Sequence, residues 1–427
     1  MKKITLIALT FLYALNSYGQ TADYIIRHGK LIDGMGNQWQ YKDVAITKDK
    51  IVAIGHLQNW KGVREIDAKG LIISPGFIDV HGHIENAAIR NPLASNFIYD
   101  GVTTVITGNC GGSMEDLKKY FNSIDSVGVT INIGSLIGHN TIRKQVMGTA
   151  NRNATEQELI QMEQLAQQAM KEGAVGMSTG LIYIPGTYAP TSEIVRLAKV
   201  VSNNGGVYAS HIRYEEDKVV DAINEAINIG REANIPVEIS HFKVSGQNNW
   251  GRSKETIPLI INARKEGIDV TIDQYPYTAS STQLSVLLPD WVLADGQDSI
   301  MARLKNPIIR KKVAAHSMGI IKKRGLKHFS YAVVANYSAD SSYNGKSIEE
   351  INILKGRYKT HKPFELYNKI KECETEIANY KNKIDEINNL IIHTCVIQYG
   401  DHEFEREVES SIYGESYFIC KNCGYER

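Results

Sequence analysis

Cysteine is scarce in most of this 427-residue chain. Only Cys110 occurs among the first 350 residues, whereas the other four cysteines lie in the last 55. A disulfide within the larger part of the chain is therefore excluded, and Cys110 is expected to be either a metal ligand or a buried core thiol. An excess of charge of one sign is also lacking. The formal net charge of +1 gives no broad electrostatic reason to bind nucleic acid.

A hydrophobic run long enough to cross a bilayer is lacking too. The apolar run at residues 4–15 is too short to span one, follows two lysines, and precedes small residues at Ser17 and Gly19. This pattern predicts a secretory signal peptide over residues 1–19 that is cleaved before Gln20, with a membrane anchor as the alternative. We therefore expect the mature protein to be periplasmic or extracellular, with no membrane span.

Glycine is frequent in the chain, at 35 residues, but none lies between Gly356 and Gly400. Apolar residues in this segment recur with the heptad spacing of a coiled coil. They are Leu366, Ile370, Cys373, Ile377, Tyr380, Ile384, Ile387 and Ile391. We expect residues 357–427 to form a helical tail, unlike the preceding sequence, that can self-associate through residues 366–391. The tail ends with four candidate zinc ligands, which are Cys395, His402, Cys420 and Cys423. A disulfide or free thiols are the alternatives for these cysteines.

The sequence before this tail changes in pattern near residue 76. Short β-rich runs and turns predict a small β-sheet subdomain at residues 20–75. In residues 76–356, apolar strands alternate with helical patterns, which predicts an α/β fold with a parallel sheet covered by helices. The predicted strands are Gly76–His83, Val102–Cys110, Thr130–His139, Val175–Gly180, Val207–Arg213, Pro236–Lys243 and Val270–Tyr277. These seven strands indicate a TIM-like (β/α)8 barrel whose eighth strand is missing.

Five side chains with metal-ligand chemistry occur where predicted strands end. His81 and His83 end the first strand, and residues i and i+2 of a strand face the same side, so both imidazoles should point one way. The other three are Cys110, His211 and His241. Any one of them is explained as easily by an exposed or structural role. Their joint position at strand ends, which face the active site in barrels, predicts a shared metal site.

The motifs around these residues resemble those of the N-acyl-D-amino-acid deacylases (D-aminoacylases) of the amidohydrolase superfamily. The matching segments are 76–83, 108–111, 138–143, 177–183, 210–215, 240–243 and 273–277. The resemblance covers about residues 22–356. Cys110 is its most discriminating residue, because a cysteine at this position separates the deacylases from hydantoinases and dihydroorotases.

The resemblance implies zinc-dependent hydrolysis of an N-acyl-D-amino acid to a carboxylic acid and a D-amino acid. Cys110, His211 and His241 would hold the zinc, while His81 and His83 would form a weaker second site that Cys110 can bridge. Residues implied more loosely for substrate binding are Lys243, Tyr183, Tyr275, Ser281 and Arg143, with His139 beside them. For each of these, a solvated or structural side chain is the alternative.

One part of the family pattern is missing from the chain. The resemblance implies a catalytic aspartate at the end of strand eight, but the match ends near Ile351, and Asp340 precedes that segment and is in the wrong place. No general acid or base is therefore assigned. We expect an incomplete barrel and a loss of about 10²–10⁴-fold in rate, as in a truncated or chimeric chain. The alternatives are a catalytically inactive, oligomerising metal-binding protein and a related cyclic-amide hydrolase.

Overall fold

The computed structural model describes residues 20–356, residues 376, 379, 380 and 383, and two strands at 404–408 and 416–420. The chain divides into two compact units, one up to Gly325 and one from Leu326 onward. The predicted signal peptide lies outside the described residues, as does the predicted heptad seam apart from the exposed Tyr380. Among the polar groups predicted to close the tail, Cys395, His402 and Cys423 also lie outside the described residues. Within the described part of the chain, no helix is both long and apolar enough to cross a membrane.

The first unit begins with the predicted small β-sheet, which the structure confirms. Its strands are β1 (Thr21–Leu31), β2 (Gln40–Thr47), β3 (Lys50–Gly55), β4 (Lys61–Asp67) and β5 (Ile72–Ile73). They lie in the order β3-β2-β1-β4, with β5 also paired to β1. Ala22 and Ile25 of β1, Ala45 of β2 and Leu57 form a small buried core.

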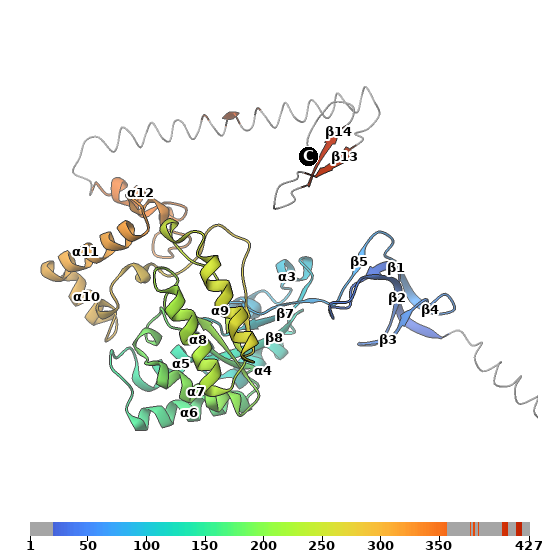
Figure 1. Cartoon of the computed structure of the whole chain (residues 1–427), viewed down its shortest axis with the longest axis horizontal. Helices are drawn as coiled ribbons and strands as arrows, with labels where there is room; N and C mark the ends of the chain where they lie inside the picture. Colours follow the sequence, from blue (N-terminus) through green and yellow to red (C-terminus); the bar gives the residue numbers. More distant parts are fainter. Residues whose placement is uncertain are drawn as a thin grey trace, which may run out of the picture. The chain divides into compact units, whose positions relative to one another are not determined.

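The main element of this unit is a sheet of seven parallel strands, as predicted from the alternating pattern. The strands are β6 (Phe77–Asp79), β7 (Val102–Thr107), β8 (Asn132–Gly138), β9 (Gly176–Gly180), β10 (Val207–His211), β11 (Val237–Ile239) and β12 (Val270–Ile272). They pair side by side in chain order from β6 to β12, and β7 and β8 are labelled in Figure 1. Among the described residues, β6 and β12 are the two outer strands, so the sheet is an open barrel.

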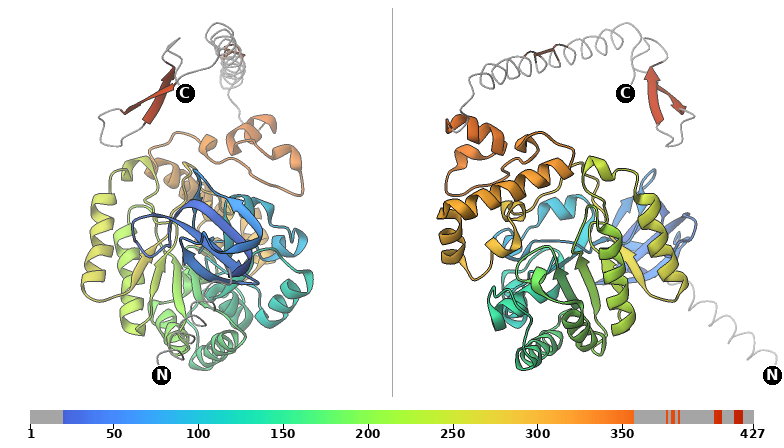
Figure 2. Two further views of the ribbon diagram at one scale, coloured as in Figure 1. Left: turned by 90° about the vertical axis from the view of Figure 1, so that its right-hand side faces the viewer. Right: turned by 60° about the vertical axis from the view of Figure 1, so that its left-hand side comes forward.

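Helices cover the outer face of this sheet (Figure 2). The helices of the unit are α2 (Glu85–Arg90), α3 (Ser95–Tyr99), α4 (Leu117–Val127), α5 (His139–Met147), α6 (Glu156–Lys171), α7 (Thr191–Ser202), α8 (Val219–Ala233), α9 (Ser253–Lys265), α10 (Gln297–Lys305) and α11 (Pro307–Lys323). Fully buried side chains such as Met162, Ile194, Leu197, Tyr208 and Ile223 form the core between sheet and helices.

The two outer strands of the sheet are much less covered than the middle ones. On β6, Phe77 is 60% exposed and Ile78 is 62% exposed, and on β12 Ile272 is 43% exposed. Within the described residues, β6 pairs only with β7 and β12 only with β11. This agrees with the expected absence of an eighth strand between them.

The second unit contains α12 (Ile348–Leu354), β13 (Phe404–Val408) and β14 (Ser416–Cys420), the last two forming an antiparallel pair. Ser347 begins α12 with a capping box, in which its hydroxyl accepts from the backbone N–H of Glu350 and the Glu350 carboxylate accepts from Ser347 in return. Val333 and Ser347 form an isolated antiparallel bridge nearby.

Candidate metal centre

The five candidate ligands meet at the carboxyl end of the parallel sheet. His211 is the last residue of β10, and the other four, namely His81, His83, Cys110 and His241, lie in the loops that follow β6, β7 and β11. We call these five residues the Cys110 cluster. Because β6 ends at Asp79, the alternation of a strand does not orient His81 and His83. Their loop does so instead, with the Asp79 carboxylate accepting a hydrogen bond from the His81 backbone N–H at 3.0 Å.

A tight loop after β7 places the thiol of Cys110. Cys110 itself has a left-handed backbone, with φ of 53°, and so does His241, with φ of 38°. Such conformations are unfavourable for residues with a side chain and persist where the surrounding structure holds them. Gly111, also left-handed, has no room for a side chain, because a Cβ there would clash with the Asn140 side chain. The Asn109 amide donates to the carbonyls of Ile106 and Val80, which ties the loop to the turn after β6.

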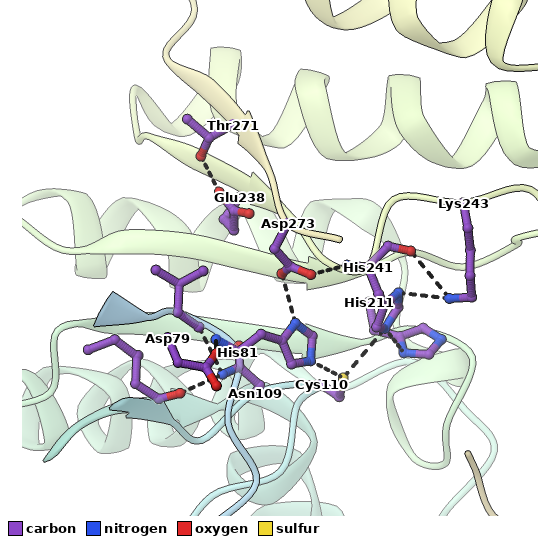
Figure 3. A network of polar contacts seen from close by, with 12 residues as sticks. Asp79, His81, Asn109, Cys110, His211, Glu238, His241, Lys243, Thr271 and Asp273 are labelled. Carbon is purple, nitrogen blue, oxygen red and sulfur yellow. Dashed lines mark hydrogen bonds and ion pairs between the residues drawn. The ribbon is translucent and has the colours of Figure 1, made fainter. Parts of the chain in front are cut away.

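Imidazole nitrogens surround the sulfur of Cys110 (Figure 3). Its Sγ lies 3.4 Å from Nε2 of His81 and 3.8 Å from Nε2 of His241. Nε2 of His241 is also 2.8 Å from Nδ1 of His211. Donor atoms lie within 4.8 Å of one another in two groups that share Cys110: the first adds His81 and His83, and the second adds His211 and His241.

The surroundings of Cys110 favour the thiolate that a metal requires. Burial opposes ionisation of the sulfur, but hydrogen bonds with the surrounding histidines outweigh burial and lower the pKa of Cys110 to about 2. One soft anionic sulfur with imidazole nitrogens is the donor set that suits Zn²⁺. Among the described residues, the buried Nε2 of His211 has no hydrogen-bond partner, and it lies 3.8 Å from Glu215. The residues present therefore fit a zinc ion in the second group.

Two carboxylates that our sequence interpretation left without a role hold these histidines from behind. Glu215 lies 2.9 Å from Nδ1 of His241 and 3.8 Å from Nε2 of His211. Burial raises the pKa of Glu215, but the hydrogen bond with His241 and the nearby positive charges outweigh it and lower that pKa to about 2. Asp273, just after β12, lies 2.8 Å from Nδ1 of His81. Both residues lie within the motifs quoted for the resemblance, which was the available signal.

Three of the predicted substrate residues lie beside the cluster. The ammonium of Lys243 donates to Glu215 at 2.6 Å and lies 3.1 Å from Nδ1 of His241. The ring of Tyr183 packs edge-on against His211 at 4.8 Å, and the Tyr275 ring lies under the Lys243 ammonium at 5.5 Å. Ser281 is exposed and forms no hydrogen bond with the cluster among the described residues, although its neighbour Thr282 bonds to the Tyr183 hydroxyl at 3.0 Å.

Arg143 and His139 lie in a separate setting, inside the core. Both are fully buried and bond to the carboxylate of Glu193, which is also buried. Arg143 also donates to the backbone carbonyl of Arg152 at 2.6 Å. We call His139, Arg143 and Glu193 the Glu193 network. Its arginine is paired and inaccessible, so the structure gives Arg143 a structural environment in place of the predicted contact with substrate.

Comparisons with known proteins show the family to which this chain belongs. Residues 64–362 match the model of the amidohydrolase family. The D-aminoacylase of Alcaligenes xylosoxydans xylosoxydans is 38% identical over 307 residues, which cover 66% of this chain and 63% of that protein. The N-acyl-D-aspartate deacylase of the same organism is 37% identical over 287 residues, which cover 62% of this chain and 57% of that protein. The chain thus spans about three fifths of the length of these curated relatives.

Solved structures of similar proteins share the fold. A crystal structure of D-aminoacylase superposes with a TM-score of 0.65 at 32% identity, covering 78% of this chain and 68% of that one. A further D-aminoacylase structure with the same scores concerns its binuclear metal centre. The N-acyl-D-glutamate deacylase of Bordetella bronchiseptica, complexed with zinc and a phosphonate inhibitor, has a TM-score of 0.59 at 35% identity. That match covers 60% of this chain and 59% of the neighbour.

Proposed function

This chain belongs to the amidohydrolase family, and we propose that it is a zinc-dependent hydrolase of N-acyl-D-amino acids. Its relatives named D-aminoacylase and N-acyl-D-aspartate deacylase support this substrate class. The zinc in the complex of the glutamate deacylase supports the choice of metal. The observation that carries the proposal is the convergence of Cys110, His211 and His241 within 4.8 Å at the carboxyl end of the sheet.

We propose that these three residues hold the catalytic zinc, and that His81, His83 and Cys110 form a second, weaker site. Three protein ligands leave one position open for water or substrate, as catalytic zinc sites require. A zinc ion bound there supplies Lewis-acid activation of water and of the amide carbonyl. The binuclear metal centre of the D-aminoacylase neighbour supports a site with two positions.

The residues beside the cluster would orient the substrate. Tyr183 and Tyr275 offer ring faces and hydroxyls, and the buried hydroxyl of Tyr275 has no partner within the described structure. Lys243 offers a positive charge to the α-carboxylate of the substrate, but it already donates to the Glu215 carboxylate and to the backbone carbonyl of His241. Direct contact with the substrate would therefore require Lys243 to exchange one of these bonds.

We propose that turnover is slow, because no residue is assigned to carry the proton to the leaving amine. The parallel sheet has no eighth strand within the described residues, and the aspartate implied for its end has no counterpart there. General acid–base catalysis contributes about 10²–10⁴-fold, which sets the size of the expected loss. The alternative function is a metal-binding protein without turnover, which the same ligand cluster would support.

An enantiomer assay tests the proposal. Full-length protein loaded with zinc is mixed with N-acetyl-D-methionine or with its L-enantiomer, and the free amino acid is measured. We expect slow release of D-methionine only, which stops on chelation and is absent in the Cys110→Ala variant. A folded, zinc-loaded sample that releases no D-methionine would overturn the hydrolase proposal and favour the metal-binding alternative.

A further inference from the structure

The first and last strands of the parallel sheet are far apart in the sheet order but are joined by one side-chain contact. β6 and β12 are its two outer strands. His81 follows β6 and Asp273 follows β12, and Nδ1 of His81 lies 2.8 Å from Oδ2 of Asp273 (Figure 3). Their side chains are 13% and 14% exposed, so water screens this bond only weakly. The bond therefore connects the open edges of the barrel at the end that carries the ligand cluster.

The same bond determines which nitrogen of His81 faces the thiol. A carboxylate that accepts a hydrogen bond from Nδ1–H selects the tautomer in which Nε2 carries a free lone pair. Nε2 of His81 is the atom that lies 3.4 Å from Sγ of Cys110. Asp273 thus presents the metal-binding nitrogen of His81 to the sulfur that both donor groups share.

The second oxygen of Asp273 acts on the other donor group. Oδ1 accepts a hydrogen bond from the backbone N–H of His241 at 2.5 Å. His241 has a left-handed backbone, with φ of 38°, a conformation that needs external support in a residue with a side chain. The imidazoles of His81 and His241 lie 5.2 Å apart, so one carboxylate holds a ligand of each group.

We propose that Asp273 is a positioning residue that closes the open side of the barrel and sets His81 and His241 for metal binding. The metal part of this inference rests on the proposed function. The closing of the sheet edges does not, because it concerns a contact between protein groups alone. Asp273 is assigned no part in moving a proton.

The Asp273→Asn variant tests this proposal with little change of shape. Its amide can donate toward Nδ1 of His81, which selects the tautomer whose Nε2 carries the proton and cannot bind a metal. Asp269→Asn is the matched control, because Asp269 is exposed and lies just before the same strand. Both proteins and the wild type are titrated with Zn²⁺ and with Co²⁺, following metal stoichiometry and the absorption band of cobalt–thiolate coordination. Amide hydrogen exchange of β6 and β12 is measured without metal.

We expect Asp273→Asn to weaken the second metal equivalent about 10–100-fold while retaining a cobalt–thiolate band from the remaining ligands. We also expect faster amide exchange in β6 and β12, with Asp269→Asn like the wild type in both respects. A variant that binds two metals with wild-type affinity would overturn the metal part. Unchanged exchange would overturn the closing contact.

A second variant covers the case in which Asp273→Asn does not fold. His81→Gln removes the other end of the same contact, so it should speed exchange in β6 and β12 to a similar extent. A folded His81→Gln protein with wild-type exchange there would overturn the closing contact. Failure of the hydrolase proposal can be told apart from failure of this inference. If the wild type releases no D-amino acid but Asp273→Asn still weakens the second metal, the inference about Asp273 is supported. A wild type that binds only one metal would overturn the metal part.

Discussion

Two sets of histidines and carboxylates occur in the first unit, and they differ in what the histidine nitrogens face. In the Glu193 network, Nε2 of His139 faces Glu193, whose other oxygen bonds to Arg143, and a positive charge balances the carboxylate inside the core. In the Cys110 cluster, the carboxylates Glu215 and Asp273 lie behind the histidines, and the opposite ring nitrogens converge around a thiol. Histidine with carboxylate is therefore not by itself a functional signature.

The difference has a physical cause. An arginine has only donors and is permanently charged, so its pairing with Glu193 satisfies the carboxylate and balances its charge. The thiolate of Cys110 and the imidazole nitrogens that face it are all acceptors. They repel one another unless a proton or a cation lies between them. The Glu193 network therefore has a structural role, whereas the Cys110 cluster favours binding of a cation. Removing single groups from each set tests this distinction.

The largest expected effect is the loss of metal from Cys110→Ala. The sulfur belongs to both donor groups, so its removal should leave neither site with three protein ligands and reduce bound zinc to near zero. Elemental analysis of purified wild-type and variant protein measures this. Because the Glu193 network is untouched, the metal-free forms of both proteins should unfold at similar denaturant concentrations. A variant with wild-type zinc content would exclude Cys110 as a ligand.

The next effect belongs to the other set. Glu193→Ala leaves Arg143 charged and buried without its partner, which typically costs about 3–5 kcal/mol of unfolding free energy. Urea unfolding of the metal-free protein measures the change, and Glu232→Ala, an exposed residue of α8, is the control. Zinc affinity of the folded Glu193→Ala protein should equal that of the wild type. A large drop in zinc affinity with little loss of stability would reverse the roles assigned to the two sets.

Sequence reasoning predicted the sheet and the cluster for the same reason. Parallel strands buried on both faces are apolar runs that can be recognised locally in the sequence. Their carboxyl ends lie at the same edge of the sheet, so the sequence alone predicted that Cys110, His211 and His241 lie close together. The roles of Glu215 and Asp273 were missed because they depend on which ring nitrogen each carboxylate faces. That orientation arises from loops, such as the one after Asp79, whose backbone angles no periodicity reveals.

Burial was the other property that the pattern did not disclose. The resemblance implied Arg143 loosely for substrate binding, and this residue follows the end of a predicted strand, as the residues of the Cys110 cluster do. The structure instead turns it into the core, where Glu193 from α7 accepts its charge. A partner fifty residues away in the sequence has no local signal. The predicted tail lies almost wholly outside the described residues and stays a prediction.

A smaller effect is expected from Glu215→Gln. Its carboxylate accepts from Nδ1 of His241, and replacing it with an amide removes the preference for the tautomer whose Nε2 can bind a metal. Zinc affinity at the first site should fall about 10–100-fold, as measured by competition with a chelating dye. Glu216→Gln is the matched control, because that neighbouring carboxylate pairs with Arg324 instead. Equal affinities in the two variants would show that the Glu215 contact does not orient a ligand.

The smallest expected effect is a difference in acid stability between wild type and Glu193→Gln. Burial raises the pKa of Glu193, but hydrogen bonds and charges from His139 and Arg143 outweigh it and leave that pKa below its ordinary value of 4.5. A carboxyl with a lowered pKa in the folded state stabilises the fold fully above pH 4.5 and loses that contribution as the pH falls further. The stability advantage of the wild type over Glu193→Gln should therefore be constant above that pH and shrink below it. Urea unfolding of the metal-free proteins across this range measures the difference, with Glu232→Gln as the control for removing one carboxyl group. An advantage that grew on acidification would mean that Glu193 is protonated more readily in the folded protein than in the unfolded chain, so that Arg143 does not compensate its charge and the contrast with the Cys110 cluster fails.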